Sequence, residues 1–328
     1  MKHLSSRMAQ LIDTAIEVPV VTSYTRLGPA IRSRMQSWRP VESYALGGRI
    51  IVLTGATSGL GLAAARTFVQ CGATVVLVGR DAAKTEAVRS ELVASSGNAH
   101  VTAGLADIGD LSAVRALAAD LRSRFDRIDV LIHNAGALSA TRRIGPDGIE
   151  ATIAAQVVGP HLLTHLLLDR VAHLDGIGRV ITMASGGMYS QPLTVSGLEM
   201  SPSSYKGTTQ YAIAKRAQVT LNEMWAERTA GTGVRFHAMH PGWADTPGVR
   251  DSLPTFRRIV GPLLRTPAEG ADTMVWLAAD DGEPLRTNGR FWLDRRERSL
   301  HLIPSTRRAD TPDRRERLWD WVSEHAGT

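Results

Sequence analysis

The chain has 328 residues, of which 43% are apolar and 21% are charged, and this composition excludes a disordered or fibrous protein. Its single cysteine, Cys71, excludes a disulfide framework and a thiolate zinc site, and we expect no metal centre. The net charge is +6, but the 34 arginines and 4 lysines are spread along the chain, which argues against a nucleic-acid partner.

Residues 1–48 form an N-terminal arm in our interpretation. Apolar residues recur at helical spacing before Pro19, and a second amphipathic stretch follows around Leu27, Ile31 and Met35. The arm either packs on its own domain or a partner subunit, or it lies on a membrane surface. In the second case its arginines would face anionic lipid while apolar side chains insert. These arginines are Arg26, Arg32, Arg34 and Arg39.

From Ile50 onward, short apolar runs alternate with helical patterns. We expect strands at 50–54, 74–78, 99–103, 130–133, 179–184, 234–239 and 290–293. We expect helices at 60–71, 82–95, 110–125, 149–174, 208–230 and 267–279. This alternation predicts right-handed crossovers and a Rossmann-type, three-layer α/β fold with a doubly wound parallel sheet. We therefore expect a single domain over 49–295, preceded by the arm and followed by a C-terminal tail, 296–328.

A glycine-rich turn joins the first strand to the first helix. Its glycines follow the pattern Gly-x-x-x-Gly-x-Gly. In a dinucleotide-binding fold such glycines permit the tight turn, the close approach of backbone to pyrophosphate, and the packing of helix on strand. The helix N-terminus adds N–H groups and a positive dipole for the phosphates. The expected cofactor-binding residues of this turn are Thr54, Gly55, Thr57, Ser58, Gly59, Leu60 and Gly61.

This spacing resembles the short-chain dehydrogenase/reductase superfamily, and further motifs extend the resemblance over residues 49–295. A Tyr-x-x-x-Lys pair stands at Tyr211 and Lys215. The stretches that begin at Met183 and His240 resemble the branch of dehydrogenase/reductase member twelve, near the retinol-dehydrogenase-like enzymes. The resemblance implies a nicotinamide dinucleotide cofactor and hydride transfer to or from a carbonyl or alcohol carbon.

The end of the second strand selects between NAD and NADP. A carboxylate there would bind the adenosine ribose 2′-OH and favour NAD. Gly79 takes that place here, and the following Arg80 can pair with a 2′-phosphate and stack on adenine. We therefore expect NADP(H) to be favoured over NAD(H). Ser58 stands where some NADP-preferring relatives carry a basic residue, so the preference need not be absolute.

Tyr211, Lys215 and Ser185 are the expected catalytic residues. Tyrosine and lysine at positions i and i+4 share one face of a helix. A free phenol has a pKa of about 10, and a nearby ammonium lowers that pKa, so that the phenol exchanges protons more readily at neutral pH. Ser185 ends the fifth strand, where its hydroxyl can hydrogen-bond a substrate carbonyl as negative charge develops.

The resemblance implies further cofactor contacts at the carboxyl ends of the strands, where open α/β sheets bind ligands. His133 stands in place of the commoner first asparagine of the family's motif after the fourth strand. The implied contacts are Asp107 and Ile108 near the adenine, Asn134, Ala135 and Gly136 where the cofactor crosses the sheet edge, and Pro241, Gly242 and Thr246 near the nicotinamide.

One position departs from the family's pattern. The superfamily has an asparagine in the long helix after the fourth strand, which holds a kinked backbone and a water that relays protons to the lysine. Gln156 stands there, with the same amide on a longer arm that either holds this water or displaces it. Gln156 is the fourth expected catalytic residue. It alone motivates an alternative function, a nucleotide-binding regulator or scaffold with weak or lost turnover.

We expect an NADP(H)-dependent oxidoreductase that acts on a carbonyl or a primary or secondary alcohol of a small substrate. Apolar residues at 188–204 and 243–264 suggest a lipophilic substrate, and oligomer packing explains them equally well. The resemblance implies a homodimer or homotetramer through the helices at 149–174 and 208–230. We expect a cytoplasmic protein, with weak membrane-surface contact through the arm as the alternative, because no export signal or spanning apolar run is evident.

Overall fold

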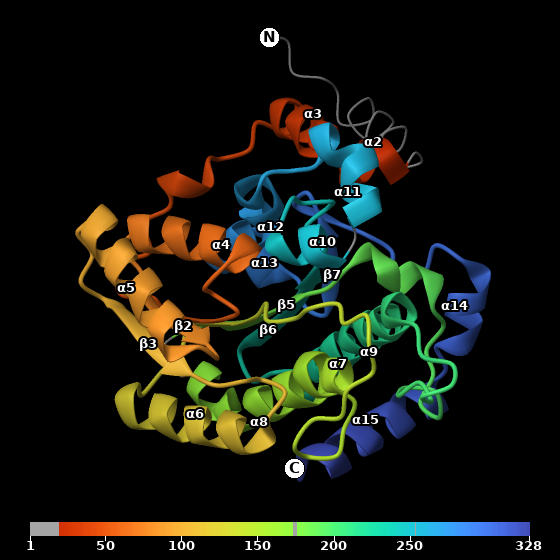
Figure 1. The fold of residues 1–328 in the computed structure, drawn as a ribbon. Helices are drawn as coiled ribbons and strands as arrows, with labels where there is room; N and C mark the ends of the chain where they lie inside the picture. Colours follow the sequence, from red (N-terminus) through yellow and green to blue (C-terminus); the bar gives the residue numbers. More distant parts are fainter. Residues whose placement is uncertain (1–19, 173–175, 253) are drawn as a thin grey trace.

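The computed structural model describes residues 20–172, 176–252 and 254–328, in which helices cover both faces of an eight-stranded sheet (Figure 1). The strand order is β3-β2-β1-β4-β5-β6-β7-β8, and only β8 runs antiparallel to its neighbour. The strands are β1 Ile50–Thr54, β2 Thr74–Gly79, β3 Val101–Leu105, β4 Val130–His133, β5 Gly178–Met183, β6 Val234–Met239, β7 Arg290–Leu293 and β8 Arg296–Glu297. The predicted doubly wound parallel sheet is confirmed.

Alternate side chains of each strand pack into two hydrophobic layers, because successive residues point to opposite faces. Ile51 and Leu53 face one layer, and Val52 faces the other. The first layer is covered by α4 Gly59–Gln70, α5 Ala82–Ser96 and α12 Pro267–Ala279, and the second by α6 Leu111–Arg124, α8 Gly159–Val171 and α9 Gly207–Arg228 (Figure 1). The strand order reverses between β1 and β4, which places a ligand crevice at their carboxyl ends.

The helix expected over 149–174 contains an irregular stretch. It consists of α7 Ala151–Ile153, a π-helical segment Ala154–Val158 and α8. Pro160 has no N–H to donate to the carbonyl of Gln156, and its ring crowds that carbonyl. The helix widens immediately before this proline, as π-helical turns do inside α-helices.

The run Ala151–Val171 is the one helix of the described residues long and apolar enough to cross a membrane. Most of its apolar window is buried inside the protein, as in the core helix of a globular domain. A Cβ on Gly159 would lie 1.9 Å from the carbonyl oxygen of Ile108, so only glycine allows this helix to approach the loop after β3.

The segment expected as a C-terminal tail contains α14 Pro304–Ala309 and α15 Pro312–Ala326. α15 lies across α8 and α9 on their outer side (Figure 1). Leu318 and Val322 of α15 are fully buried there, and the Trp319 ring lies 4.8 Å from that of Trp225. The resemblance implies that subunits pair through α8 and α9. Because α15 covers part of both helices, such pairing would have to use the part of their surface that α15 leaves open.

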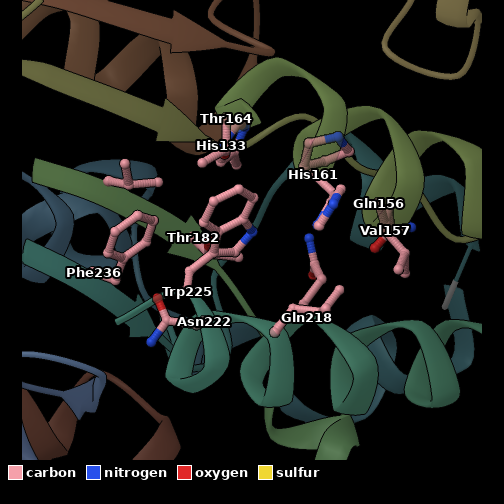
Figure 2. A pocket seen from close by; sticks show the side chains of 13 residues that line it. His133, Gln156, Val157, His161, Thr164, Thr182, Gln218, Asn222, Trp225 and Phe236 are labelled. Carbon is pink, nitrogen blue, oxygen red and sulfur yellow. The ribbon is translucent and has the colours of Figure 1, made fainter. Parts of the chain in front are cut away.

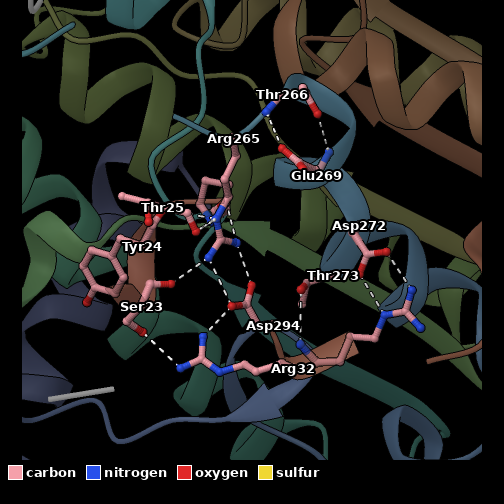
Figure 3. A network of polar contacts seen from close by, with 12 residues as sticks. Ser23, Tyr24, Thr25, Arg32, Arg265, Thr266, Glu269, Asp272, Thr273 and Asp294 are labelled. Atoms are coloured by element: carbon pink, nitrogen blue, oxygen red, sulfur yellow. Dashed lines mark hydrogen bonds and ion pairs between the residues drawn. The ribbon is translucent and has the colours of Figure 1, made fainter. Parts of the chain in front are cut away.

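The arm is fixed to the domain by a buried ion cluster. The described part of the arm contains α2 Val20–Tyr24 and α3 Leu27–Gln36. The first helix expected in the arm, before Pro19, lies outside the described residues. Arg32 of α3 is fully buried and pairs with Asp294, which also accepts a hydrogen bond of 2.6 Å from Arg265 (Figure 3). Arg32 therefore does not face lipid, contrary to the membrane interpretation, because its charge is neutralised inside the protein.

Candidate functional site

Thr54 and Asn134 fix the turn that follows β1. The hydroxyl of Thr54 donates to the carbonyl oxygen of Ile132 at 3.1 Å and accepts from the backbone N–H groups of Asn134 and Ala135, each at 3.0 Å. The side-chain amide of Asn134 donates to the carbonyl oxygens of Thr54 at 3.0 Å and Gly55 at 3.1 Å. The ends of β1 and β4 are thereby tied together at the crevice.

The glycines of this turn have no room for a side chain. Gly55 has a φ of 66°, and a Cβ there would lie 2.9 Å from the Cα of Ala135. A Cβ on Gly61 would lie 2.2 Å from the carbonyl oxygen of Gly55. The remaining expected residues lie where α4 begins, whose first N–H groups have no intrahelical acceptor, and they are Thr57, Ser58, Gly59 and Leu60.

The residues expected to hold the adenosine lie at the ends of β2 and β3. A Cβ on Gly79 would lie 2.3 Å from the hydroxyl oxygen of Thr85, so an acidic side chain there would require Thr85 to move. Arg80 and Asp107 are exposed, with 3.8 Å between guanidinium nitrogen and carboxylate oxygen, while Ile108 is buried. The structure therefore brings a flat cation and a carboxylate to the same edge of the crevice.

The loop after β6 covers the glycine-rich turn. The side chain of Thr246 lies 3.4 Å from the position that a Cβ on Gly59 would take. Gly242 has a φ of 74°, and a Cβ there would lie 2.2 Å from Nε of Arg265, whose guanidinium also donates to the Pro241 carbonyl at 3.2 Å. Arg265 thus fixes the loop that carries the residues expected near the nicotinamide.

Ser185, Tyr211 and Lys215 meet at the ends of β5 and α9. Lys215 is almost fully buried, with Nζ 5.3 Å from the centroid of the Tyr211 ring. Its ammonium donates to the Met183 carbonyl at 2.7 Å and to Oε1 of Gln218 at 2.8 Å. Ser185 and Tyr211 are half-buried, so both lie partly open to the crevice.

Burial shifts the pKa values of this pair. It lowers the pKa of Lys215 to about 7 and raises that of Tyr211 to about 12, while a hydrogen bond with Ser185 acts on Tyr211 in the opposite direction. Burial therefore keeps the pKa of Tyr211 above its ordinary value in the protein alone, and the lowering of that pKa by Lys215 stays a prediction. A positive charge from the oxidised nicotinamide would favour the phenolate.

Gln156 lies in the π-helical segment, where its side chain is fully buried against Gly136. Its amide nitrogen donates to the carbonyl of Ala137 at 2.9 Å, and its Oε1 has no hydrogen-bond partner within the described ranges. Gln156 therefore fixes the loop after β4 on one side and presents a free acceptor on the other.

A cavity of about 30 Å³ lies between the π-helical segment, α8, α9 and the sheet (Figure 2). Gln156 lines it together with Gln218, which reaches from α9 and accepts from Lys215. His133, His161 and Asn222 also line it, and in each one side-chain atom finds no partner among the described residues. A water molecule fits a polar cavity of this size.

We expect the stability of the protein to fall as the pH decreases from about 6.5 towards 3. Burial lowers the pKa of His133, His161 and His240 to about 3 and that of His237 to about 4. In this window the unfolded state binds more protons, so each histidine removes up to about 1.4 kcal/mol of unfolding free energy per pH unit. Urea unfolding at pH 7.5, 6.0 and 5.0 measures the slope.

Histidine variants isolate this effect from the carboxylates that also titrate. His161→Gln should reduce the dependence of the unfolding free energy on pH. His100→Gln, at an exposed position, should leave this dependence unchanged. Equal slopes for the wild type and the His161→Gln variant would contradict the prediction.

Sequence reasoning missed three residues of the site. Gln218 follows Lys215 by three positions, so the shared helix face was a signal that could have identified it. Arg265 and Tyr24 approach the site from distant segments, and no local pattern marks them. The carbonyl of Tyr24 accepts from the N–H of Trp243 at 2.6 Å, which brings the arm to the loop after β6.

Comparison with known proteins gives consistent matches. The family model described as short chain dehydrogenase matches residues 49–255. Human dehydrogenase/reductase SDR family member 12 is 38% identical over 281 residues, which cover 86% of this chain and 87% of the relative. Bovine retinol dehydrogenase 12 is 31% identical over 304 residues, which cover 92% of this chain and 93% of the relative.

A solved structure matches in three dimensions as well. The crystal structure of a protein from Mycobacterium paratuberculosis superposes with a TM-score of 0.69 and 27% sequence identity. The match covers 88% of this chain and 98% of that one. The sheet and its flanking helices are thus shared over nearly the whole of that protein.

Proposed function

The chain belongs to the short-chain dehydrogenase family, with relatives among the retinol dehydrogenases, and from this premise we propose that it is an NADP(H)-dependent oxidoreductase of small carbonyl compounds or alcohols. The resemblance stated from the motifs is confirmed, and the family acts on CH–OH and C=O groups. The observation that carries the proposal is the convergence of Ser185, Tyr211 and Lys215 at the end of β5, on the same sheet whose β1 ends in a glycine turn with no room for side chains.

A dinucleotide fits this crevice, because Gly55 and Gly61 leave backbone exposed where phosphates approach and α4 begins there. The bound nicotinamide supplies or accepts the hydride. Tyr211 transfers the proton between its phenol oxygen and the substrate oxygen, and the Ser185 hydroxyl hydrogen-bonds that same oxygen. The Lys215 ammonium stabilises the phenolate and holds the ribose hydroxyls.

We propose that Gln156 acts in the proton path as a positioning residue. Lys215 contacts Gln218, and Gln218 lines the cavity. Gln156, whose Oε1 has no hydrogen-bond partner among the described residues, lines the same cavity. A water held there would connect these groups, as the asparagine-bound water does in the pattern that the family implies. The longer amide of Gln156 thus holds a water rather than displacing it.

Arg80→Ala is expected to raise the Kd for NADPH by about 10–100-fold, because a charge-assisted pair with the 2′-phosphate is lost. The Kd for NADH, which lacks that phosphate, should change little. Fluorescence titration of both cofactors measures the two constants. Arg66→Ala, which removes an exposed arginine of the Arg66–Glu91 pair, is the matched control. An equal loss of affinity for both cofactors would contradict the assignment of Arg80.

The support for a lipophilic substrate comes from one of the two expected regions. In the insertion at 188–204, Met188, Leu193 and Leu198 are buried in the core and do not line the crevice. After β6, four apolar side chains are half-buried, and they are Trp243, Val249, Val260 and Leu263. Leu253 and the side chains of Phe256 and Ile259 lie outside what the structure describes. We propose that the second region lines the substrate site.

The alternative function, a regulator or scaffold without turnover, predicts tight NADPH binding and no reaction. A thermal-shift titration with NADPH and NADH, followed by a panel of ketones, aldehydes and alcohols read at the NADPH absorbance, separates the two. Turnover of any carbonyl in the panel supports the oxidoreductase. Saturable NADPH binding without turnover across the panel supports the alternative.

Assembly and location stay predictions of this proposal. Light scattering of the purified protein tests the homodimer or homotetramer. Weak membrane contact through the arm is tested by liposome co-sedimentation of the full chain and of a chain without residues 1–48. Leu27 and Ile31 are exposed on α3 and remain open to such contact, whereas Arg32 is not.

A further inference from the structure

We propose that Tyr24, supplied by the N-terminal arm, is a specificity-determining residue that forms one wall of the substrate site. The inference rests on the proposed function, because it concerns the carbonyl site built around Ser185. It assigns to the arm a role in choosing the substrate, in addition to packing on its own domain. The substrate class is a ketone whose bulk beside the carbonyl carbon is limited by this wall.

The first observation is where the Tyr24 ring lies. Cε2 and the hydroxyl oxygen of Tyr24 are 2.9 Å and 3.3 Å from the position that a Cβ on Gly186 would take. Gly186 directly follows Ser185, the residue expected to hold the substrate oxygen. Tyr24 and Gly186 are both half-buried, so the ring covers the backbone beside Ser185 while remaining partly open. The Tyr24 ring therefore lies against the residue that directly follows Ser185.

The second observation is the aromatic corner around Tyr24. Its ring meets His240 edge to face with centroids 4.5 Å apart, and Trp243 with centroids 5.8 Å apart. His240 and Trp243 belong to the segment after β6 that also carries the residues expected near the nicotinamide. Tyr24 thus bridges the loops that follow β5 and β6, between which a substrate must approach the cofactor. Aromatic rings in such edge contacts form a stiff, flat surface.

The third observation is how firmly the backbone at Tyr24 is held. Arg265 donates to the carbonyl oxygens of Ser23 at 2.8 Å, Tyr24 at 3.1 Å and Thr25 at 3.3 Å (Figure 3). Ser23 and Thr25 are almost fully buried, and Asp294 neutralises Arg265 from the other side. A wall held by buried hydrogen bonds does not yield to a larger substrate, and a fixed wall is what size discrimination requires.

The test compares two ketones of different bulk in the NADPH-loaded enzyme, acetophenone and isobutyrophenone. The readout is the ratio of kcat/KM for the bulkier ketone to that for the smaller one. Tyr24→Ala should raise this ratio at least about 10-fold, because the discrimination supplied by a pocket wall is of this order per carbon atom. Tyr24→Phe keeps the ring and should leave the ratio unchanged. An unchanged ratio in Tyr24→Ala overturns the inference.

The control is Tyr189→Ala, which removes an aromatic side chain from the turn after Ser185. Tyr189 packs on Phe291, and its hydroxyl donates to the Ser299 carbonyl, away from Tyr24. It should lower stability without changing the ratio, and a ratio that rises as much as in Tyr24→Ala overturns the inference. Tyr24→Phe keeps the ring and its contacts with His240 and Trp243, and the melting temperatures of the two Tyr24 variants separate loss of the ring from loss of folding.

Failure of the proposed function gives a different result. If wild-type enzyme binds both ketones in the presence of NADPH, measured by tryptophan fluorescence, but turns over neither, the proposed reaction is wrong. The wall is then tested by the ratio of the two Kd values, for which the same change in Tyr24→Ala is expected. If the wild type neither binds nor reduces either ketone, both the function and the inference are overturned.

Discussion

Replacing Tyr211 by phenylalanine should lower kcat by about 10²–10⁴-fold, the range that a positioned acid or base contributes. The phenol is the group beside Ser185 that can transfer a proton to the substrate oxygen, and Lys215 sits behind its ring with Nζ 5.3 Å from the centroid. Phenylalanine keeps the ring and its packing but has no proton to transfer. Initial rates with a ketone that the wild-type enzyme reduces measure the effect.

The same variant should bind NADPH with nearly the wild-type Kd, because the phosphate and adenosine contacts are assigned in our proposal to the glycine turn and Arg80. Tyr205→Phe is a matched control, since this hydroxyl bonds Glu150 at 3.1 Å, outside the triad, and its loss should leave kcat unchanged. Full activity of the Tyr211→Phe variant would contradict the proposed proton transfer by Tyr211. A parallel loss of NADPH binding would assign Tyr211 to cofactor binding instead.

Replacing Asp294 by asparagine should destabilise the protein by about 3–5 kcal/mol, as expected when one partner of a buried charge cluster is removed. Asp294 is almost fully buried between the guanidinium groups of Arg32 and Arg265, which are equally buried. Asparagine keeps the size and the amide can still accept one hydrogen bond, but two cations then lack their anion. Urea unfolding at neutral pH measures the change.

Asparagine is also chosen because it suits the backbone conformation at position 294. Asp294 and Arg295 form the two-residue turn between β7 and β8, and both have a φ of 53°. Asparagine tolerates this left-handed conformation at least as well as aspartate, so the variant adds no strain of its own. The loss of stability therefore reports the missing charge and its hydrogen bonds, without a contribution from backbone strain.

Two further variants test whether the loss of stability comes from the buried ion cluster. Arg32→Met leaves the Arg265–Asp294 pair neutral and should cost less than Asp294→Asn. Glu91→Gln removes the exposed carboxylate that pairs with Arg66, and should cost at most about 1 kcal/mol. A cost for Asp294→Asn as small as that of Glu91→Gln would show that the cluster does not hold the arm.

The parts of the fold that could be predicted are those with a local signal. The strands at β1, β4, β6 and β7 match their predicted bounds, because each is a short, mostly buried and largely apolar segment next to turn residues. The glycine turn and the pair Tyr211–Lys215 were predicted for the same reason, since each depends on spacing within a single element. The roles assigned to these residues stay predictions.

Other features were missed although a signal was present. Pro160 lies within the expected helix 149–174, and its missing N–H was sufficient to predict a disturbed turn near Gln156. Thr311, which caps α15, and Gly327, with a φ of 65° at its end, mark the limits of a helix in the segment taken as a tail.

The rest could not be predicted because it depends on contacts between distant segments. Arg32 pairs with Asp294, 262 residues away, and nothing in the amphipathic pattern of the arm distinguishes it from an arginine that faces lipid. The approach of Tyr24 to Gly186 likewise exists only after the arm has folded onto the domain. A pattern of apolar residues predicts which side chains are buried, but it does not identify the residues that those side chains contact.

The position of α15 has a consequence for biosynthesis. α8 and α9 leave the ribosome well before α15, which begins about 80 residues after α9 ends. Until then the side of Trp225 that α15 covers faces water, because Trp319 and Leu318 have not yet been translated. A nascent chain stalled before residue 312 should therefore bind chaperones and resist protease less than the released protein, since exposed apolar surface marks incomplete folding.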